Sequence, residues 1–557
     1  MARPWLQHYP AGVPAEIDEY EFSSIKDIFE RSVQKFRTRV AFSNLGTTLT
    51  YEDLDRLSRD FAAYLQSLPG VRKGDRVALM MPNILDYPVA LFGVLRAGLV
   101  AVNINPLYTA RELEYQLKDS GARAIVILDN FAHVLQAVLP HTSLEHLVVT
   151  TLGGAHGFFK KRLIDFVVRH VKKLVPPYSL PGAISMHTAL QQGRRQALKH
   201  VTLAHGDLAF LQYTGGTTGV ARGAMLTHGN MVASLQQASA WIKGVLLEGE
   251  EIVVTALPMY HIFCLTANVL TFMKHGGHLL LITNPRDLPA FIRALQRVPF
   301  TVFTGVNTLF NGLLNQADFA KLDFSHLKLA LGGGAAIQRA VAERWQQITG
   351  KPLMEAYGLT ECSPGVCINP LNGEFNGSIG VPLPSTLVSI RDDAGREVPL
   401  GENGELCVKG PQVMRGYWQS PKATAEVLTP DGWLKTGDIA RLDADAYIYI
   451  TDRKKDVVLV SGFNVYPTEV ENVIALHPGV LEAAVIGVPD AKTGEAVKLF
   501  VVRKDPNLAV DDLLSFCREQ LTSYKIPHQI EFCVDLPKSP VGKILRRELR
   551  LPRPAAA

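Results

Sequence analysis

The chain has 557 residues, of which 47% are apolar and 20% are charged, and its formal net charge is +4. This length and balance predict more than one domain and a large apolar core. The near-neutral charge gives no indication of a nucleic-acid partner. The six cysteines form no CxxC pair, which argues against a zinc site and is typical of a reducing compartment such as the cytoplasm.

No targeting or membrane-spanning segment is expected. Residues 1–5 lack the apolar core of a signal peptide, and no uninterrupted apolar run reaches about 18 residues. The nearest candidate, residues 87–102, contains Arg96 and two glycines. A buried segment of an α/β core is therefore the better interpretation.

The first 150 residues alternate between helix and strand patterns. An amphipathic stretch runs over residues 51–68, and apolar runs of strand length follow at 77–81, 124–128 and 147–150. Thr109 and Glu112 have the spacing of a capping box, which predicts a helix after Thr109. Strands separated by helices of this length predict parallel sheets.

A glycine- and threonine-rich loop at residues 212–223 follows an apolar strand at 208–211. Successive backbone N–H groups in such a loop form a concave anion site, and Arg222 adds a positive charge. The plain alternative is a flexible surface hairpin. The loop is not a P-loop of the Walker A type, because residues 224–226 predict a returning strand and the next helix is expected only near Asn230.

The alternation resumes with strands predicted at 252–256, 279–282, 300–303 and 329–331. Beyond about residue 376, short strands between Gly/Pro turns predict a small β subdomain. A charge cluster at 452–456 precedes a last segment with its own pattern, in which helices are predicted at 468–476 and 510–521 and strands at 483–488 and 497–502. The final residues, 552–557, are expected to be disordered.

Several motifs, taken together, resemble those of the acyl-adenylate-forming enzymes, which include acyl-CoA synthetases, luciferases and peptide-synthetase adenylation domains. These motifs are the loop at 212–223, Thr360-Glu361, the segment 431–438 that ends in Asp438, the run Asp452-Arg453-Lys454-Lys455, and the terminal Gly542-Lys543. They occur in the family order between about residues 20 and 548. The segments 257–263, 304–310 and 460–467 most resemble bacterial long-chain fatty acid–CoA ligases.

The resemblance implies an α/β fold. Its large N-terminal body of parallel-rich sheets flanked by helices, with a small β subdomain, would span residues 1–454. A mobile α+β C-terminal domain carrying the catalytic lysine would span residues 455–557; we call these two parts the body and the tail. The resemblance also implies that MgATP, CoA and a fatty acid are bound, and that an oligomer is possible.

The resemblance assigns roles residue by residue. Lys543, Glu361, Thr360 and His261 would serve catalysis, with Glu361 on Mg²⁺, for which one carboxylate can suffice. ATP would be bound by Tyr213, Thr214, Gly215, Gly216, Thr217, Thr218, Gly219, Arg222, Gly332, Gly333, Gly334, Ala335, Tyr357, Gly358, Thr360, Asp438 and Arg453. Taken alone, most of these residues would be ordinary turn, cap or surface groups.

The remaining assignments concern the moving parts and the acyl group. Lys455 would be the hinge, and Gly462 and Phe463 would lie on the CoA side. The candidates for the acyl pocket are Ile262, Phe263, Val306, Leu309 and Phe310. Four residues depart from the family pattern: Gly215 and Arg222 stand where many relatives have Ser and Lys, and Lys435 and Ala446 stand where His and Gly are usual.

The reaction implied is ATP-dependent formation of acyl-AMP and then of acyl-CoA, with release of pyrophosphate and AMP. Within the family, a medium-chain or aryl acid or a carrier-protein acceptor is the alternative. A membrane-associated fatty-acid-binding protein with a decayed site is the alternative from another class, and the retention of Glu361, Asp438, Arg453 and Lys543 argues against it.

One basic segment, residues 158–174, belongs to none of these motifs. Leu163, Val167, Val171 and Leu174 recur at helical spacing, and the segment has six Lys and Arg residues against Asp165 alone. Such a helix can lie in an anionic membrane surface, here the inner face of the cytoplasmic membrane. The alternative is a solvated helix whose apolar stripe packs against the body.

Overall fold

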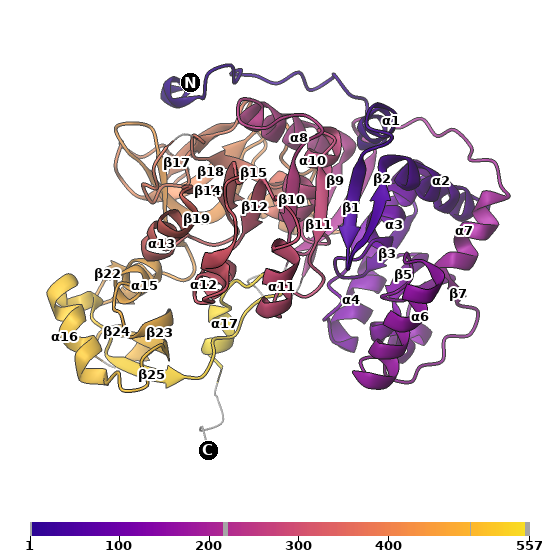
Figure 1. The fold of residues 1–557 in the computed structure, drawn as a ribbon. Helices are drawn as coiled ribbons and strands as arrows, with labels where there is room; N and C mark the ends of the chain where they lie inside the picture. Colours follow the sequence, from indigo (N-terminus) through magenta and orange to yellow (C-terminus); the bar gives the residue numbers. More distant parts are fainter. Residues whose placement is uncertain (1–2, 215–220, 372, 491, 552–557) are drawn as a thin grey trace.

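The computed structural model describes residues 3–214, 221–371, 373–490 and 492–551. The predicted calls at 215–219 and 552–557 lie outside these ranges. The chain forms an α/β body and a smaller C-terminal unit (Figure 1). The predicted fold class is confirmed, because parallel-rich sheets flanked by helices make up most of the body.

The first sheet of the body has seven strands in the order β7-β6-β5-β3-β4-β8-β9. Its neighbours are parallel except for the last pair, β8 and β9. The strands are β3 Arg76–Met80, β4 Val100–Asn103, β5 Ala124–Leu128, β6 His146–Thr150, β7 Ile184–Ser185, β8 Leu208–Thr214 and β9 Arg222–Thr227. The predicted strand and returning strand around the glycine-rich loop are therefore confirmed.

The second sheet has nine strands in the order β16-β15-β14-β13-β12-β10-β11-β1-β2. Its central neighbours from β1 to β14 are parallel, and antiparallel strands close both edges. The strands are β1 Val40–Asn44, β2 Thr47–Thr50, β10 Ile252–Thr255, β11 His278–Leu281, β12 Val302–Gly305, β13 Leu329–Gly332, β14 Leu353–Gly358, β15 Gly365–Ile368 and β16 Val381–Pro382. The strand predicted at 300–303 begins two residues later.

Helices of the body pack on the two sheets. They are α1 Ile25–Lys35, α2 Tyr51–Ser67, α3 Asp86–Arg96, α4 Ala110–Ser120, α5 Ala132–Val138, α6 Phe158–Phe166, α7 Met186–Arg194, α8 His228–Ile242, α9 Ile262–Cys264, α10 Thr271–Lys274, α11 Leu288–Leu295, α12 Asn307–Leu314, α13 Arg339–Thr349 and α14 Pro421–Val427. The capping box predicted at Thr109 and Glu112 is present in α4. Helix α8 begins at His228 because Thr227 caps it.

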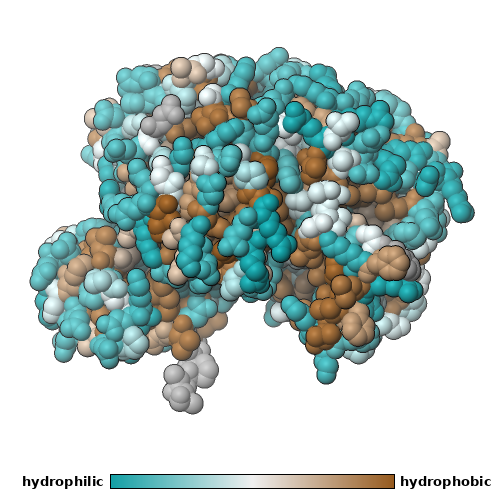
Figure 2. Space-filling model, viewed as in Figure 1, coloured by the Kyte–Doolittle hydropathy of each residue, from teal (hydrophilic) through white to brown (hydrophobic). Residues whose placement is uncertain are grey.

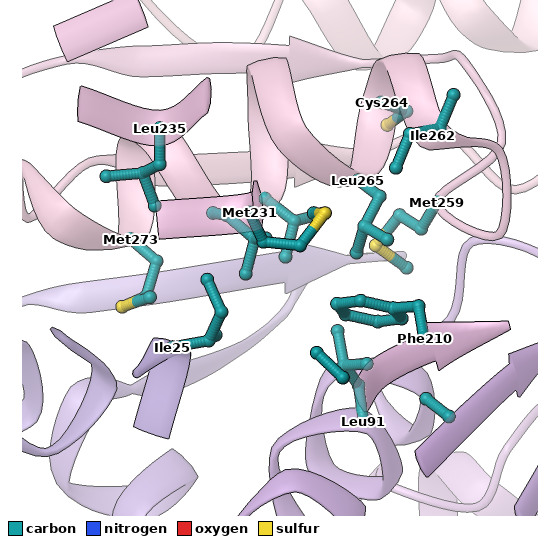
Figure 3. Close-up of a cluster of buried hydrophobic side chains, with 14 of the residues drawn as sticks. Ile25, Leu91, Phe210, Met231, Leu235, Met259, Ile262, Cys264, Leu265 and Met273 are labelled. Carbon is teal, nitrogen blue, oxygen red and sulfur yellow. The ribbon is translucent and has the colours of Figure 1, made fainter. Parts of the chain in front are cut away.

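One apolar core joins the two sheets. Phe210 of β8 lies in it with Leu91 of α3, Met231 of α8 and Met259, and all four side chains are fully buried (Figure 3). Helix α3 is buried over its whole length, so the apolar segment at 87–102 is core as predicted. Among the described residues, no helix is both long and apolar enough to cross a bilayer.

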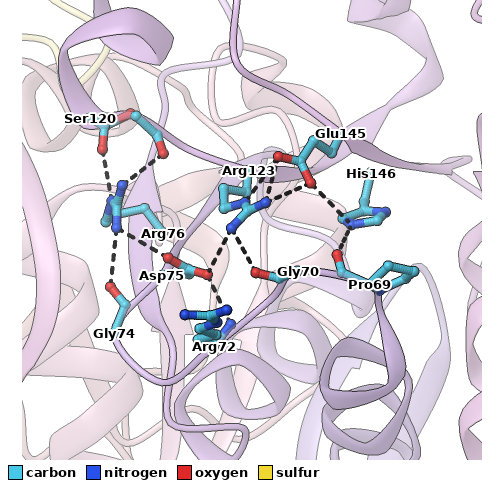
Figure 4. A network of polar contacts seen from close by, with 11 residues as sticks. Pro69, Gly70, Arg72, Gly74, Asp75, Arg76, Ser120, Arg123, Glu145 and His146 are labelled. Carbon is cyan, nitrogen blue, oxygen red and sulfur yellow. Dashed lines mark hydrogen bonds and ion pairs between the residues drawn. The ribbon is translucent and has the colours of Figure 1, made fainter.

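A polar network lies at the amino ends of β3, β5 and β6 (Figure 4). Arg123 donates to Glu145 Oε1 at 2.6 Å and to the Gly70 carbonyl, and Arg76 Nε donates to the Ser120 carbonyl at 2.9 Å. Because β8 runs parallel to these strands, the glycine-rich loop leaves the sheet at the opposite edge. The network therefore ties strand starts together away from the candidate site.

The predicted β subdomain is a four-stranded antiparallel sheet, β17-β18-β19-β20. Its strands are β17 Leu387–Arg391, β18 Gly404–Lys409, β19 Leu434–Leu442 and β20 Ile448–Arg453. The tail has a separate five-stranded sheet with its own apolar core. Its elements are β21 Val458–Val460, β22 Phe463–Val465, α15 Pro467–Ile474, β23 Val480–Asp490, β24 Gly494–Arg503, α16 Val510–Gln520, β25 Gln529–Cys533 and α17 Arg546–Leu549.

Helix α6 and the π-helical turn η4 (Val167–Val171) make up most of the basic segment. In this segment, apolar side chains of the predicted stripe are exposed to solvent, whereas an amphipathic helix usually buries them. Leu163 is 64% exposed, and Val171 and Leu174 are also exposed, whereas Val168 beside the predicted stripe is buried. Val167, the fourth residue of the stripe, is partly buried, so most but not all of the stripe faces away from the body. In Figure 2, hydrophobic side chains reach the surface over α6 at the lower right.

Candidate active site

The carboxyl ends of parallel strands in the second sheet meet at one edge. Val306 follows β12, the glycines at 332–334 lie at the end of β13, and Tyr357 and Gly358 end β14. Open α/β sheets bind ligands at this edge, because loops that leave neighbouring strands converge there. The structure thus brings together residues that lie more than fifty positions apart in the sequence.

The glycine run 332–334 lies close to neighbouring residues of the body. Gly334 has φ of +76°, a left-handed conformation that favours glycine. The Gly333 amide donates to the Gly305 carbonyl at 3.2 Å, and a Cβ at Gly333 would lie 3.2 Å from the ring of Phe263. Protein atoms therefore pack closely on Gly333 and leave little room there for a side chain, which explains the glycine.

The Asp438 carboxylate is held in place by two neighbouring side chains. Its Oδ2 accepts a hydrogen bond from the Tyr357 hydroxyl at 2.6 Å, and its Oδ1 lies 3.1 Å from Arg453 Nε. Asp438 and Arg453 face each other across β19 and β20. Burial and the Asp438 carboxylate raise the pKa of the Tyr357 hydroxyl, so it stays a donor. The carboxylate could accept from two hydroxyls of a ribose.

Glu361 lies in the short 3-10 turn Thr360–Cys362 that follows β14. Its Oε1 accepts a hydrogen bond from Tyr417 at 2.6 Å, and the Arg222 guanidinium lies 5.6 Å from the centre of the Tyr417 ring. A carboxylate has further acceptor sites beyond this bond. Thr360 and Glu361 thus offer oxygen donors beside the stem of the phosphate loop.

These oxygen donors fit Mg²⁺, which takes few protein ligands and usually bridges phosphates. No cluster of three or more His, Cys, Asp or Glu residues that could enclose a metal occurs within the described ranges. A metal held by Glu361 would therefore depend on the nucleotide for most of its ligands. That arrangement is the one expected for a MgATP site.

The glycine- and threonine-rich loop at 212–223, which we call the phosphate loop, is described only at its two ends. Thr214 ends β8 and Arg222 begins β9, and the two residues pair across the hairpin. The Tyr213 hydroxyl donates to Asp119 Oδ2 of α4 at 2.5 Å. The hydroxyl of Tyr213 is therefore used to fasten the loop stem to α4.

Lys543 of the tail reaches the same site. The loop that carries it is held to the body where Thr308 Oγ1 donates to the Gly542 carbonyl at 3.0 Å. Burial, and then the neighbouring Arg453 guanidinium, lower the pKa of Lys543 to about 8. The ammonium is thus placed beside the polar group of Asp438 and Arg453, with a weakened hold on its proton.

His261 caps α9, and its Nδ1 accepts from the Phe263 amide at 3.3 Å. Burial, and then Lys543, lower the pKa of His261 to about 4, so the imidazole is neutral near pH 7. His261 therefore lies near Lys543 as an uncharged group. It can orient a ligand but carries no charge for the phosphates.

The five acyl-pocket candidates divide into two groups. Phe263 and Val306 lie against Gly333 and Gly334, next to the nucleotide-side residues. Ile262 and Phe310 are fully buried, and Phe310 packs on Trp345 with ring centres 4.9 Å apart. Leu309 is partly buried between the two core clusters. Phe263 and Val306 are thus the candidates best placed to touch a ligand.

The hinge and CoA-side candidates lie apart from Lys543. Lys455 lies in the turn after β20 and is exposed overall. Partial desolvation of its ammonium lowers the pKa of Lys455. Gly462 has φ of +84° in the β21–β22 hairpin. Phe463 is 57% exposed and stacks on Tyr524 of the tail at 4.9 Å. In this structure, therefore, the tail is oriented so that Lys543 lies at the site. The β21–β22 hairpin lies away from it.

The family of the chain follows from comparisons with known proteins. The sequence profile described as AMP-binding enzyme matches residues 29–418, and that described as AMP-binding enzyme C-terminal domain matches residues 469–543. The chain belongs to the AMP-binding enzyme family. Its second matched region begins in α15, so it lies within the tail.

Three relatives place this AMP-binding enzyme more closely. A long-chain-fatty-acid–CoA ligase of Escherichia coli O6:H1 is 57% identical over 99% of this chain and 98% of its own. ATP-bound MatB from Rhodopseudomonas palustris has a TM-score of 0.82 at 28% identity, with 94% of this chain and 98% of that one covered. The anthranilate CoA ligase AuaEII with anthranoyl-AMP has a TM-score of 0.85 at 25% identity, with 96% and 98% covered.

Sequence reasoning missed two groups of this AMP-binding enzyme. Tyr417 contacts both Glu361 and Arg222, and nothing in the sequence marks that pairing across 56 positions. Arg546, three residues after Lys543, forms ion pairs with Asp452 and Glu471. Its position just after the terminal motif Gly542-Lys543 was the available signal, but its partners depend on how the tail docks.

Proposed function

We propose that this AMP-binding enzyme activates long-chain fatty acids with MgATP and transfers them to CoA. The observation that carries the proposal is the bond of 3.0 Å from Thr308 of the body to the Gly542 carbonyl, which holds the neighbouring Lys543 at the site. Asp438 and Arg453 act on its charge there, and an ammonium in that place can meet both a carboxylate and an α-phosphate. The name of the E. coli relative supports the choice of long-chain acids and of CoA.

In the first step, a fatty-acid carboxylate oxygen attacks the α-phosphorus of ATP. The bond between the α-phosphorus and the bridging oxygen of the β-phosphate breaks, and pyrophosphate leaves with that electron pair. Asp438 would hold the ribose, and Lys543 would neutralise charge that develops on the α-phosphate. Mg²⁺ held by Glu361 would supply further charge stabilisation on the leaving phosphates.

In the second step, the CoA sulfur attacks the acyl carbonyl carbon of acyl-AMP. The bond from that carbon to the AMP oxygen breaks, AMP leaves, and the thiol proton passes to solvent. The tail would first turn about Lys455, which removes Lys543 from the site and brings Gly462 and Phe463 toward it. Such a switch would let one cavity serve two reactions in sequence.

The test is an assay with purified protein, MgATP, CoA and a panel of acids from acetate to oleate and benzoate. We expect AMP and thioester in equal amounts, with oleate preferred over the short acids. Chain preference should be graded, since one methylene is worth about 1–3 kcal/mol in an apolar pocket. Acyl-AMP without transfer to CoA would favour a carrier-protein acceptor, and binding without AMP would favour a decayed site.

The basic segment 158–174 supplies a second, finer proposal, a contact with anionic membrane at the inner face of the cytoplasmic membrane. Some of its basic side chains bond to the body: Lys161 Nζ donates to Thr151 Oγ1 at 2.7 Å, and Arg169 pairs with Asp129 at 2.6 Å. Lys160 donates to Thr47 at 3.1 Å. A helix fastened by its polar face leaves its apolar face for another surface, and long-chain acids partition into bilayers.

The charges left to meet lipid headgroups are fewer than the sequence predicts. Lys172 and Lys173 are exposed at the end of the segment, next to the exposed Val171 and Leu174. Each such Lys contributes about 1 kcal/mol near an anionic surface. Binding should therefore depend on both salt and apolar contact.

Co-sedimentation with phosphatidylglycerol-containing vesicles tests this surface. Replacing Lys172 and Lys173 by Glu should weaken binding by about 30-fold or more. Replacing Leu163 and Val171 by Ser should weaken it at every salt concentration. Lys422→Glu, at an exposed position on α14, is the matched control and should change nothing. Binding that ignores salt and both pairs of changes would remove the segment as the anchor.

A further inference from the structure

Arg546 of the tail takes part in several hydrogen bonds and ion pairs. It begins α17, which is labelled in Figure 1, and the loop before that helix contacts Thr308 of α12 through Gly542. Its guanidinium makes a bidentate pair with Glu471, with Nε 3.0 Å from Oε1 and Nη2 2.7 Å from Oε2. Nη2 also donates to Thr468 Oγ1 at 3.0 Å, and Nη1 donates to Asp452 Oδ1 at 2.9 Å. Its side chain is only 16% exposed.

Asp452 lies on the other side of the predicted hinge. It belongs to β20 and pairs with Ile439 of β19, so it is part of the β subdomain of the body. Its side chain is buried, and its Oδ2 accepts from the Thr468 amide of α15 at 2.7 Å. Both tail contacts of this carboxylate, those to Arg546 and Thr468, therefore cross Lys455.

Arg546 bridges Glu471 of the tail and Asp452 of the body. The pair with Glu471 is permanent, whereas the pair with Asp452 can be released. Glu471 and Arg546 are both tail residues, and Glu471 Oε1 also accepts from the Val485 amide at 2.8 Å. A turn of the tail about Lys455 would leave that pair intact. The same turn would separate Asp452 from Arg546 and Thr468, since Asp452 stays with the sheet of the β subdomain.

The site itself does not attract Lys543 strongly. Burial and the Arg453 and Arg546 guanidinium groups disfavour the ammonium. The Asp438 and Asp456 carboxylates offset this only in part, so the pKa of Lys543 is lowered. Among the contacts described between tail and body, those near Lys543 are neutral, from Thr308 to Gly542 and from Asn311 to the Leu481 carbonyl. An ion pair close to Lys543 in the chain can supply the missing attraction.

We propose that Arg546 is a positioning residue for the acyl-AMP step, because its bridge to Asp452 holds Lys543 in the nucleotide site and is released when the tail turns for the thioester step. This inference rests on the proposed two-step function. Arg546 does not touch the reacting atoms in this assignment. It sets how often Lys543 is in place.

The test measures the two half-reactions separately in Arg546→Gln and Asp452→Asn. Fatty-acid-dependent exchange of pyrophosphate into ATP should fall about 10- to 100-fold, as expected when one partner of a buried ion pair is removed. Conversion of preformed acyl-AMP and CoA to thioester should stay within about twofold, because that orientation lacks the bridge. Thermal unfolding of each variant checks that the tail remains folded.

Arg550→Gln is the matched control. Arg550 lies in the same segment and pairs with Asp456 at 3.0 Å, and both residues are on the tail side of the hinge. Asp456 also lies 3.6 Å from Arg546 Nη1, a pair that a turn about Lys455 leaves within the tail. The same chemical change there should leave the exchange rate unchanged. Equal losses in Arg550→Gln and Arg546→Gln would overturn the proposal.

Rescue distinguishes positioning from a merely structural role. Asn311 of α12 and Leu481 of β23 touch across the interface at 3.3 Å. Replacing both by Cys and joining them with a short bis-maleimide should hold the tail in this orientation. Exchange should then recover in the Arg546→Gln background, and thioester formation should be blocked.

Failure of the cross-link to restore exchange would overturn the positioning role, as would equal loss of both half-reactions in Arg546→Gln. A wild-type protein that makes no acyl-AMP would instead refute the proposed function. The two failures are therefore separable. Single-cysteine variants treated with the same reagent control for modification of the native thiols.

Discussion

The body and the tail contribute to the candidate site in different ways. Asp438 is held by Tyr357 and Arg453, and Glu361 by Tyr417, all within sheets and loops of one body. Lys543 lies in a loop of the tail, which is held to the body by a few contacts between the two parts. The body half is thus preorganised, whereas the tail half is present only when the tail is docked. Changes in the body should affect both steps, and changes in the tail should affect one.

Replacing Lys543 by Ala should have the largest effect. Removing a charge that stabilises the developing transition state should lower pyrophosphate exchange by about 10²–10³-fold. Thioester formation from preformed acyl-AMP should be largely kept, because Lys543 has then left the site. Comparable loss in both half-reactions would mean that Lys543 does not divide the two steps.

Asp438→Ala should have the next largest effect, and it should strike both steps. The change removes the acceptor for Tyr357 and leaves the Arg453 guanidinium without its carboxylate, and each lost charged hydrogen bond costs about 1.5–3 kcal/mol. Exchange and thioester formation should both fall about 10- to 100-fold, measured against thermal stability. An effect confined to one half-reaction would contradict a shared nucleotide site.

Lys455→Pro and Gly462→Leu should give smaller and opposite results. Proline restricts φ at the predicted hinge, and leucine is strained at φ of +84° and would obstruct the path of the thiol. Both should spare pyrophosphate exchange and slow thioester formation by about tenfold. If exchange is lost first in either variant, the hinge or the CoA-side assignment is wrong.

The pH profile should show the smallest effect. Lys543 has its pKa lowered to about 8, so its ammonium is present below that pH and is lost above it. The kcat/KM for ATP in the exchange assay should therefore decline above about pH 8, since this constant reports groups of the free enzyme. Lys543→Arg, whose charge persists, should lack that decline. An unchanged profile in Lys543→Arg would assign it to another group.

Much of the fold was predictable because local chemistry specifies it. The capping box at Thr109 and Glu112 and the apolar strand runs of the first sheet depend on near neighbours, and the structure has them where the sequence predicts. The glycine-rich loop between β8 and β9 was predictable for the same reason. The site residues came as a set only through family resemblance, since Asp438 or Lys543 taken singly is an ordinary turn or surface residue.

Tertiary structure decided the rest. The spacing of apolar residues in 158–174 predicts an amphipathic segment. Only the positions of Thr47, Thr151 and Asp129 determine that three of its basic side chains bond to the body. The pairings of Glu361 with Tyr417 and of Asp452 with Arg546 join residues 56 and 94 positions apart. A sequence pattern records what each segment can bury, whereas a contact between distant segments depends on how both are placed. Packing alone sets that placement.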